Sequence, residues 1–306
     1  MKKFIFAAFA LLTLVACNKT NDNNELKVYG WYGWPEKVDA DSLGRLFKEW
    51  KGHGLYGVCV NAGGFNVERI QTAARIAHEQ GLEYHAWIPT MLQQGKDSTW
   101  YTVNRLGQSA YVPEQRAYVT YYATLDPHSP EVTEWLKEQY LSVADIPEVD
   151  YVQLDYIRYA DVVLSEGLWK KYDSQIHHQW CDTIDGQRRI HEYPGADYCY
   201  CDNCLDDFRQ ASGINLRERL ANGDDPAGIA EWAQWRQDQV TQLVNTIAEA
   251  VHAKGKKLSA DVFPGPKSHA RWMVRQEWDK WDVDVFMPMN YNDFYLQPAA
   301  WVGTIT

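Results

Sequence analysis

Two alternating periodicities divide the chain from residue 27 onward. Short runs rich in apolar and aromatic residues predict β-strands over residues 27–34, 55–61, 82–88, 149–156, 258–263 and 283–289. Between them, apolar residues recur every three or four positions, which predicts helices over residues 39–52, 66–80, 226–253 and 268–281 and another that begins at Pro130. Strands separated by helices favour βαβ units and a parallel sheet.

Residues that start or stop helices support these boundaries. Asp39 or Asp41 is available to cap the first helix, and Gly81 can end the second. Ser129 is a suitable cap for a helix with Pro130 at its first position. The polar stretch after Pro89 predicts a long loop over one end of the sheet.

The predicted fold is an α/β (β/α)8 TIM barrel. Near-continuous apolar strands fit a sheet that is buried on both faces, and no glycine-rich fingerprint follows the first strand, which disfavours a dinucleotide-binding fold. The sequence shows about six strands, whereas a complete barrel has eight. We therefore expect an incomplete barrel over residues 27–306, with a cysteine-rich insertion at about residues 160–225.

The N-terminal residues are typical of a targeting signal. Lys2 and Lys3 precede an apolar run over residues 4–16, which is too short to span a bilayer as a helix. Leu14, Val15 and Ala16 stand directly before Cys17, and this arrangement is similar to a lipoprotein signal; the alternative is an ordinary signal peptide with a chance cysteine. We expect a signal peptide over residues 1–17, lipidation of Cys17 and a flexible tether over residues 18–26.

Charge and aromatic content narrow the possible partners. The net charge of −11 disfavours nucleic acid, which requires basic patches. The chain contains 14 tryptophans and 19 tyrosines, and although many must belong to the core, this abundance suits carbohydrate binding because sugar faces stack on aromatic rings. We expect a lipid-anchored protein of the periplasm, outer membrane or cell surface whose partner is a carbohydrate.

Two aspartates at strand ends are the catalytic candidates. In a TIM barrel the site lies at the C-terminal ends of the strands, where Asp155 ends the fourth strand and Asp261 the fifth. Arg158 is close enough in sequence to pair with Asp155 and hold it ionised, whereas apolar neighbours such as Phe263 can keep Asp261 protonated. The alternatives are a structural Asp155–Arg158 pair and a strand-end cap at Asp261. Asp126 is a weaker candidate and is typical of a turn before Pro127.

Other polar and aromatic residues at the strand ends are candidates for substrate binding. His85 either contacts a sugar hydroxyl or is a buried, hydrogen-bonded histidine. For each single tryptophan or tyrosine, core packing is the alternative to stacking against sugar. The candidate substrate-binding residues are Trp31, Trp34, Asn61, His85, Trp87, Tyr156, Arg158, Asn290 and Tyr291.

The cysteines pose a separate question. Cys199, Cys201 and Cys204 form a C-x-C-x-x-C cluster, with Cys181 upstream. Four thiolates make a closed structural zinc site, while an exported location permits disulfides; both alternatives remain open. No catalytic cofactor is expected, and Cys59 within a strand is typical of a small core residue.

Three segments resemble bacterial glycoside-hydrolase-like TIM-barrel families. They are Leu125-Asp126-Pro127 before a helix, the fourth strand Gln153-Leu154-Asp155-Tyr156-Ile157-Arg158-Tyr159, and Met287-Pro288-Met289-Asn290-Tyr291. The resemblance covers most of residues 27–292 and implies that Asp155 is the nucleophile and Asp261 the general acid/base. The Cys199–Cys201 segment is also similar to the zinc-bound cysteines of some barrel β-galactosidases. Gln153 stands where α-galactosidase relatives have a lysine, so the sugar does not follow from the resemblance.

These features together predict a cell-envelope glycosidase that uses two carboxylates. A nucleophilic Asp155 implies retention of configuration, and a wide carboxyl separation implies inversion. The alternatives are a glycan-binding lipoprotein without turnover and a structural protein of the envelope.

Overall fold

The computed structural model describes residues 26–168, 181–184, 187–190, 192–265, 267 and 269–305. The predicted signal peptide over residues 1–17 and nearly all of the predicted tether lie outside this part of the chain. None of the helices in the described ranges combines the length and apolar character that crossing a membrane requires.

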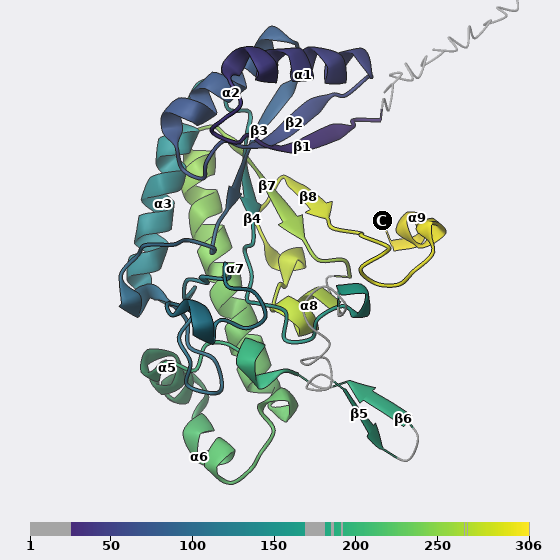
Figure 1. Ribbon diagram of the computed structural model, residues 1–306. Helices are drawn as coiled ribbons and strands as arrows, with labels where there is room; N and C mark the ends of the chain where they lie inside the picture. Colours follow the sequence, from purple (N-terminus) through teal and green to yellow (C-terminus); the bar gives the residue numbers. More distant parts are fainter. Residues whose placement is uncertain are drawn as a thin grey trace, which may run out of the picture.

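Six parallel strands form a curled half-barrel (Figure 1). Their order in the sheet is β1-β2-β3-β4-β7-β8, so each strand lies beside the next one of the sheet along the chain. The sequence therefore predicted the fold class correctly, including the incomplete barrel. The strands are β1 (Tyr29–Gly33), β2 (Gly57–Asn61), β3 (Glu83–Pro89), β4 (Tyr151–Asp155), β7 (Lys257–Val262) and β8 (Val285–Pro288).

Four long helices cover the outer face of the half-barrel (Figure 1). Their apolar faces pack against the strands and form the main core with the outward-pointing side chains of the sheet, among them Val58, Val152 and Leu154. The helices are α1 (Ala40–Gly52), α2 (Val67–Glu79), α3 (Pro130–Ala144) and α7 (Ala230–Ala253).

Helix ends follow the predicted capping residues in most cases. Asp39 caps α1 by accepting a hydrogen bond from the Ser42 amide at 2.7 Å. Ser129 caps α3, which has Pro130 at its first position as predicted. The predicted start of the long helix at Pro226 is wrong, because residues 226–228 form a separate 3-10 turn and Ile229 is extended, so α7 begins at Ala230.

The predicted helix over residues 268–281 is also too long. Helix α8 spans His269–Val274 and stops because Arg275 adopts a left-handed backbone with φ 59°. There the Arg275 guanidinium pairs with the buried Glu192 at 2.7 Å. A 3-10 turn, η6 (Trp278–Lys280), precedes β8.

Two long excursions leave the half-barrel, one after β3 and one after β4. The loop from residue 90 to 129 carries two 3-10 turns, η1 (Ser98–Trp100) and η2 (Pro113–Gln115). The insertion between β4 and α7 is more structured than the sequence predicted. It contains η3 (Glu166–Leu168), β5 (Cys181–Ile184), β6 (Gln187–Ile190), η4 (Pro194–Ala196), α5 (Asp202–Ser212), α6 (Leu216–Ala221) and η5 (Pro226–Gly228). The chain ends in η7 (Ala299–Trp301) and α9 (Val302–Ile305).

Candidate active site

The register of the sheet sets Asp155 and Asp261 side by side. On the neighbouring strands β4 and β7, Gln153 pairs with Ser259 and Leu154 with Ala260, so the next residue on each strand is an aspartate at the same level. Side chains alternate along a strand, and both aspartates point to the same side as Gln153, which donates a hydrogen bond to Asp261 at 2.9 Å. Both side chains face the inside of the half-barrel.

Asp155 is buried and held by two N–H donors. The indole N–H of Trp87 donates to its Oδ2 at 2.8 Å, and the Tyr156 amide donates to its Oδ1 at 2.6 Å. Burial raises the pKa of Asp155 above its ordinary value, while these two donors and the charge of Arg158 act in the opposite direction. Tyr156 adopts a left-handed backbone with φ 47°, a strained conformation for a residue with a side chain.

Asp261 is the more strongly perturbed of the two acids. Burial raises its pKa well above the ordinary range, and the negative charge of Asp155 raises it further. Hydrogen bonds from Gln153 and Trp31 only partly oppose this shift. Two buried carboxyl groups that repel each other do not ionise together easily, so the pair holds one proton over a wider pH range than either acid alone.

A cavity of about 330 Å³ lies above the Asp155 side of the pair; we call it the tyrosine cavity. Its walls come from β3, β4, the loop after β3, the insertion and the segment after β8. Its polar groups are Asp155, Arg158, Asp161 and Ser165. Its aromatic lining consists of Trp87, Tyr118, Tyr121, Tyr122, Tyr156, Phe263, Tyr291, Phe294 and Tyr295.

A second cavity lies between the two edge strands of the half-barrel; we call it the edge cavity. Trp31 of β1, Asp261 of β7 and Met287 of β8 line it. Tyr291 and Met289 line both cavities, so the two adjoin there. Burial raises the pKa of Tyr291 to about 12, and the charges of Asp261 and Asp155 contribute to that shift. Tyr291 thus stands close to both aspartates.

The predicted pairing of Arg158 with Asp155 is wrong. Arg158 forms its ion pair with Asp161 at 2.9 Å and bonds the carbonyl of Tyr159 and the hydroxyl of Tyr122. Its guanidinium also lies over the Phe263 ring, 4.8 Å from the centroid. It therefore affects Asp155 only through its more distant charge.

The structure brings some predicted binding residues to the cavities and not others. Trp34 is 7% exposed, donates to the Val38 carbonyl at 2.8 Å and is covered by Arg69, so its predicted role as a stacking platform is wrong. Asn61 accepts hydrogen bonds from the amides of Gly63 and Gly64, which makes it a turn residue outside both cavities.

His85 lies deeper in the barrel than the aspartate pair. It is fully buried, bonds Ser259 at 3.0 Å and stacks on Tyr151 with ring centroids 4.1 Å apart. In the register it faces Tyr151, four residues before Asp155, and this position matches the buried, hydrogen-bonded alternative. Asn290 follows β8, and both polar atoms of its side chain are buried without a hydrogen-bond partner among the described residues.

Sequence reasoning missed the part of the site that comes from the loop after β3. Tyr118, Tyr121 and Tyr122 line the tyrosine cavity although they lie outside every predicted strand. The tyrosine-rich run was visible in the sequence, and the loop was expected over the barrel mouth. Which of its rings point inward depends on contacts such as the Tyr118 hydroxyl donating to Asp161 at 2.6 Å.

Comparison with known proteins identifies the family. Residues 63–305 match the model of the family described as glycosyl hydrolase-like 10. The chain belongs to the glycosyl hydrolase-like 10 family. A search of curated proteins found no significant match.

One of the solved structures that match this chain shares its fold. The glycoside hydrolase domain of PgaB (BpsB) from Bordetella bronchiseptica superposes with a TM-score of 0.55 at 12% identity, covering 85% of this chain and 74% of that chain. A GH36 alpha-galactosidase from Geobacillus stearothermophilus in complex with raffinose aligns with a TM-score of 0.46 at 11% identity, covering 90% of this chain and 34% of that one. At this identity the first of these likenesses establishes a common fold.

Proposed function

We propose that this member of the glycosyl hydrolase-like 10 family hydrolyses glycosidic bonds with Asp155 and Asp261. The main support for this proposal is the pair of buried carboxyl groups, which lie at one level on neighbouring strands. They stand at the C-terminal end of the barrel strands, where the catalytic residues of TIM-barrel enzymes lie. Glycoside hydrolysis ordinarily requires two such groups. The aromatic lining of the tyrosine cavity beside them supports a sugar as the substrate.

The environments of the two acids support different roles. Asp261 is the general acid, because burial and the neighbouring Asp155 both favour its protonated form. Asp155 is the carboxylate that attacks the sugar or stabilises positive charge on it, because N–H donors from Trp87 and Tyr156 favour its ionised form. The proton of Asp261 passes to the leaving-group oxygen, and water later returns a proton to the enzyme.

The register also supports a stereochemical outcome. Neighbouring strands lie about 4.8 Å apart, and retaining glycosidases hold their two carboxyl groups about 5–5.5 Å apart. Asp155 and Asp261 at one level on such strands therefore fit a double displacement through a glycosyl-Asp155 intermediate. NMR of the first-formed product checks this, because an inverted anomer would exclude the intermediate.

We place this activity at the cell envelope, on a lipid anchor at Cys17. The basic start, the apolar run over residues 4–16 and the Leu14-Val15-Ala16 sequence before the cysteine support this location. The carbohydrate is then either a polymer of the cell envelope itself or one that reaches the envelope from outside the cell.

Asp155→Asn tests the proposal directly. The full chain is assayed for released reducing ends on envelope and plant oligosaccharides, including amino-sugar polymers. We expect Asp155→Asn to abolish hydrolysis while glycan affinity changes little, because its charge acts mainly in the transition state. Asp150→Asn is the matched control, since Asp150 precedes the same strand at the opposite end of the barrel and bonds His78 and the Tyr84 amide.

One observation favours glycan binding without turnover as a second candidate. Of the pair, Asp155 lines the tyrosine cavity and Asp261 lines the edge cavity. The other aspartate of the tyrosine cavity, Asp161, forms an ion pair with Arg158. An aromatic cavity in which one of the two carboxylates is taken up by an ion pair is suited to holding a sugar. If the protein bound a glycan tightly, hydrolysed none of the panel and kept the same affinity in Asp155→Asn, glycan binding would replace hydrolysis as the proposed function.

A further inference from the structure

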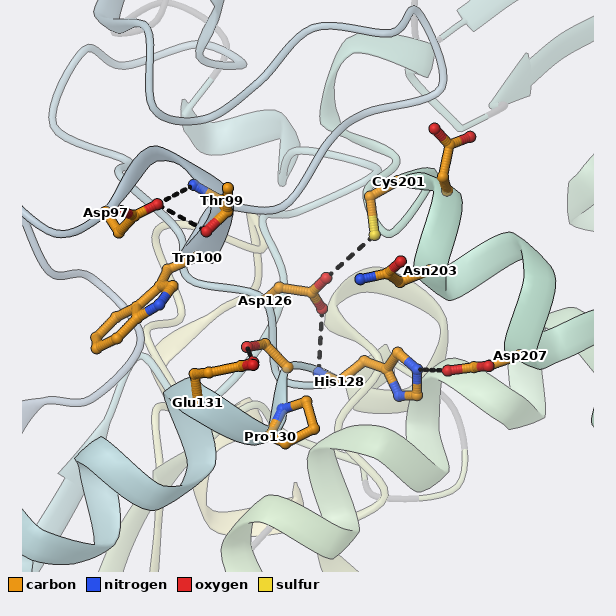
Figure 2. A pocket seen from close by; sticks show the side chains of 12 residues that line it. Asp97, Thr99, Trp100, Asp126, His128, Pro130, Glu131, Cys201, Asn203 and Asp207 are labelled. Atoms are coloured by element: carbon orange, nitrogen blue, oxygen red, sulfur yellow. Dashed lines mark hydrogen bonds and ion pairs between the residues drawn. The ribbon is translucent and has the colours of Figure 1, made fainter.

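Asp126 meets the cysteine cluster in space, although more than 70 residues separate them. Its Oδ2 lies 3.3 Å from the Sγ of Cys201 and 3.3 Å from the Sγ of Cys204, and its Oδ1 lies 3.8 Å from the Sγ of Cys199. Figure 2 shows the carboxylate of Asp126 directed at Cys201 across a pocket. Four groups that can ligate a metal therefore converge from two segments of the chain.

The local backbone holds the three sulfurs on one side. Cys201 is the N-cap of α5, and its Sγ accepts a hydrogen bond from the Cys204 amide at 3.4 Å, so both cysteines belong to the first turn. Cys199 adopts a left-handed backbone with φ 86°, which is costly for a residue with a side chain, and its Sγ lies 2.7 Å from that of Cys204. Cys199, Cys201 and Cys204 are free cysteines in the structure.

Loop contacts fix Asp126 opposite these sulfurs. Its backbone amide donates to the Trp100 carbonyl at 2.8 Å, and its carboxylate accepts from the His128 amide at 3.0 Å. The cysteine segment joins the same loop, because the amides of Cys199 and Tyr200 donate to the Val103 carbonyl. The four groups thus meet within hydrogen-bonded backbone on both sides.

The negative charge of Asp126 and of nearby acidic residues favours a bound cation. Cys199 and Cys204 are fully buried and Asp126 is 5% exposed. Among the residues that the structure describes, no lysine or arginine forms an ion pair with Asp126. The pocket in Figure 2 is also lined by Asp97 and Glu131, and by two acids that have a partner of their own, Asp202 with Arg217 and Asp207 with His128. A buried carboxylate without a counter-charge is costly, and a divalent cation bound between Asp126 and the three sulfurs would remove that cost.

We propose that Asp126, Cys199, Cys201 and Cys204 bind one zinc ion. Three thiolates and one carboxylate are a ligand set that zinc accepts in tetrahedral geometry, and the thiolates disfavour magnesium and calcium. Four protein ligands leave no open position, so the ion is structural. It fastens the start of α5, within the insertion, to the turn before α3. Asp126 here replaces Cys181 of the predicted ligand set; the side chain of Cys181 lies outside the described part of the structure.

The metal content of the full chain tests this site without any substrate. The protein is purified without a metal-chelating resin, its zinc is measured by mass spectrometry, and the zinc environment is measured by X-ray absorption. We expect about one zinc per chain, with three sulfurs at about 2.3 Å and one oxygen at about 2.0–2.2 Å. Asp126→Asn and Cys201→Ser should lose zinc to a chelator that leaves the wild type loaded.

Two matched variants complete the test. Asp202→Asn makes the same charge change as Asp126→Asn, and it lies next to Cys201 in the first turn of α5. Because Asp202 is exposed and pairs with Arg217 at 2.7 Å, zinc should be retained in this variant. Cys181→Ser should also retain zinc. Zinc lost from Cys181→Ser, or four sulfurs around the wild-type ion, would overturn the assignment of Asp126.

Thiol counting separates the remaining outcomes. Denatured wild-type protein should release zinc and show every thiol of the cluster reactive without a reductant. A metal-free wild type overturns the proposal, whether two thiols are missing through a Cys199–Cys204 disulfide or all are free. Wild-type measurements decide these cases even if the variants fold poorly.

Discussion

Replacing Trp87 by phenylalanine isolates the hydrogen bond that prepares Asp155. The change keeps a ring at the site and removes the indole N–H that donates to Asp155 Oδ2 at 2.8 Å. Asp155 is 6% exposed, so water does not readily replace this donor. The ionised form of Asp155 loses stabilisation, and its protonated form is affected much less.

The expected magnitude follows from the type of bond. A hydrogen bond to a charged group contributes about 1.5–3 kcal/mol. Burial already raises the pKa of Asp155, and loss of the donor raises it further. An acid whose pKa is raised on folding lowers the stability of the folded state as pH rises through the interval between its unfolded and folded pKa. Between acid and neutral pH, the free energy of unfolding of the variant should therefore fall by about 1.5–3 kcal/mol more than that of the wild type.

Urea unfolding at about pH 4, near the ordinary pKa of aspartate, and at about pH 8 measures this difference without a substrate. Trp281→Phe is the control, because the buried Trp281 donates to the neutral Thr241 hydroxyl at 3.2 Å and its loss should cost the same at both pH values. If Trp87→Phe also cost the same at both, the N–H of Trp87 would not act on the ionisation of Asp155.

Three further predictions concern other parts of the molecule. Asp197→Ala should lower the free energy of unfolding by about 3–5 kcal/mol, because it leaves the buried Arg236 without its ion-pair partner; a loss below about 1 kcal/mol in urea would contradict this. Asp261→Asn should raise the melting temperature at neutral pH, because folding at that pH must otherwise protonate an aspartate that is ionised in the unfolded chain, and the gain should vanish in acid; equal gains at both would exclude a raised pKa. Cys17→Ala should move the protein from the membrane fraction to the soluble one, and a variant that still sedimented with membranes would require another attachment.

Local patterns explain how much of the fold the sequence predicted. Each strand of the six-stranded sheet was visible as a short apolar run and each long helix from its periodicity, because burial constrains residues that are close in the chain. Asp39, Ser129 and Pro130 act within a single turn, so their roles could be predicted from neighbours in sequence. The start of α7 and the end of α8 could not be predicted in this way; α8 ends before Arg275, whose side chain pairs with Glu192, 83 residues away.

The candidate site divides in the same way. The sequence alone determined that Asp155 and Asp261 stand at the C-terminal ends of apolar strands of a parallel sheet. Only the tertiary structure decided that the β4–β7 register sets them at one level, that Trp87 rather than Arg158 donates to Asp155, and that the loop after β3 supplies the tyrosines.

Asp126 gives the clearest case of this division. In the sequence it is a turn residue before Pro127, and the structure confirms that role through the hydrogen bond from the His128 amide. Its approach to Cys201 and Cys204 depends on how two excursions from different strands pack against each other. Periodicity and capping describe interactions between residues close in the chain, whereas a site depends on distances between residues far apart in it, and folding alone fixes those distances.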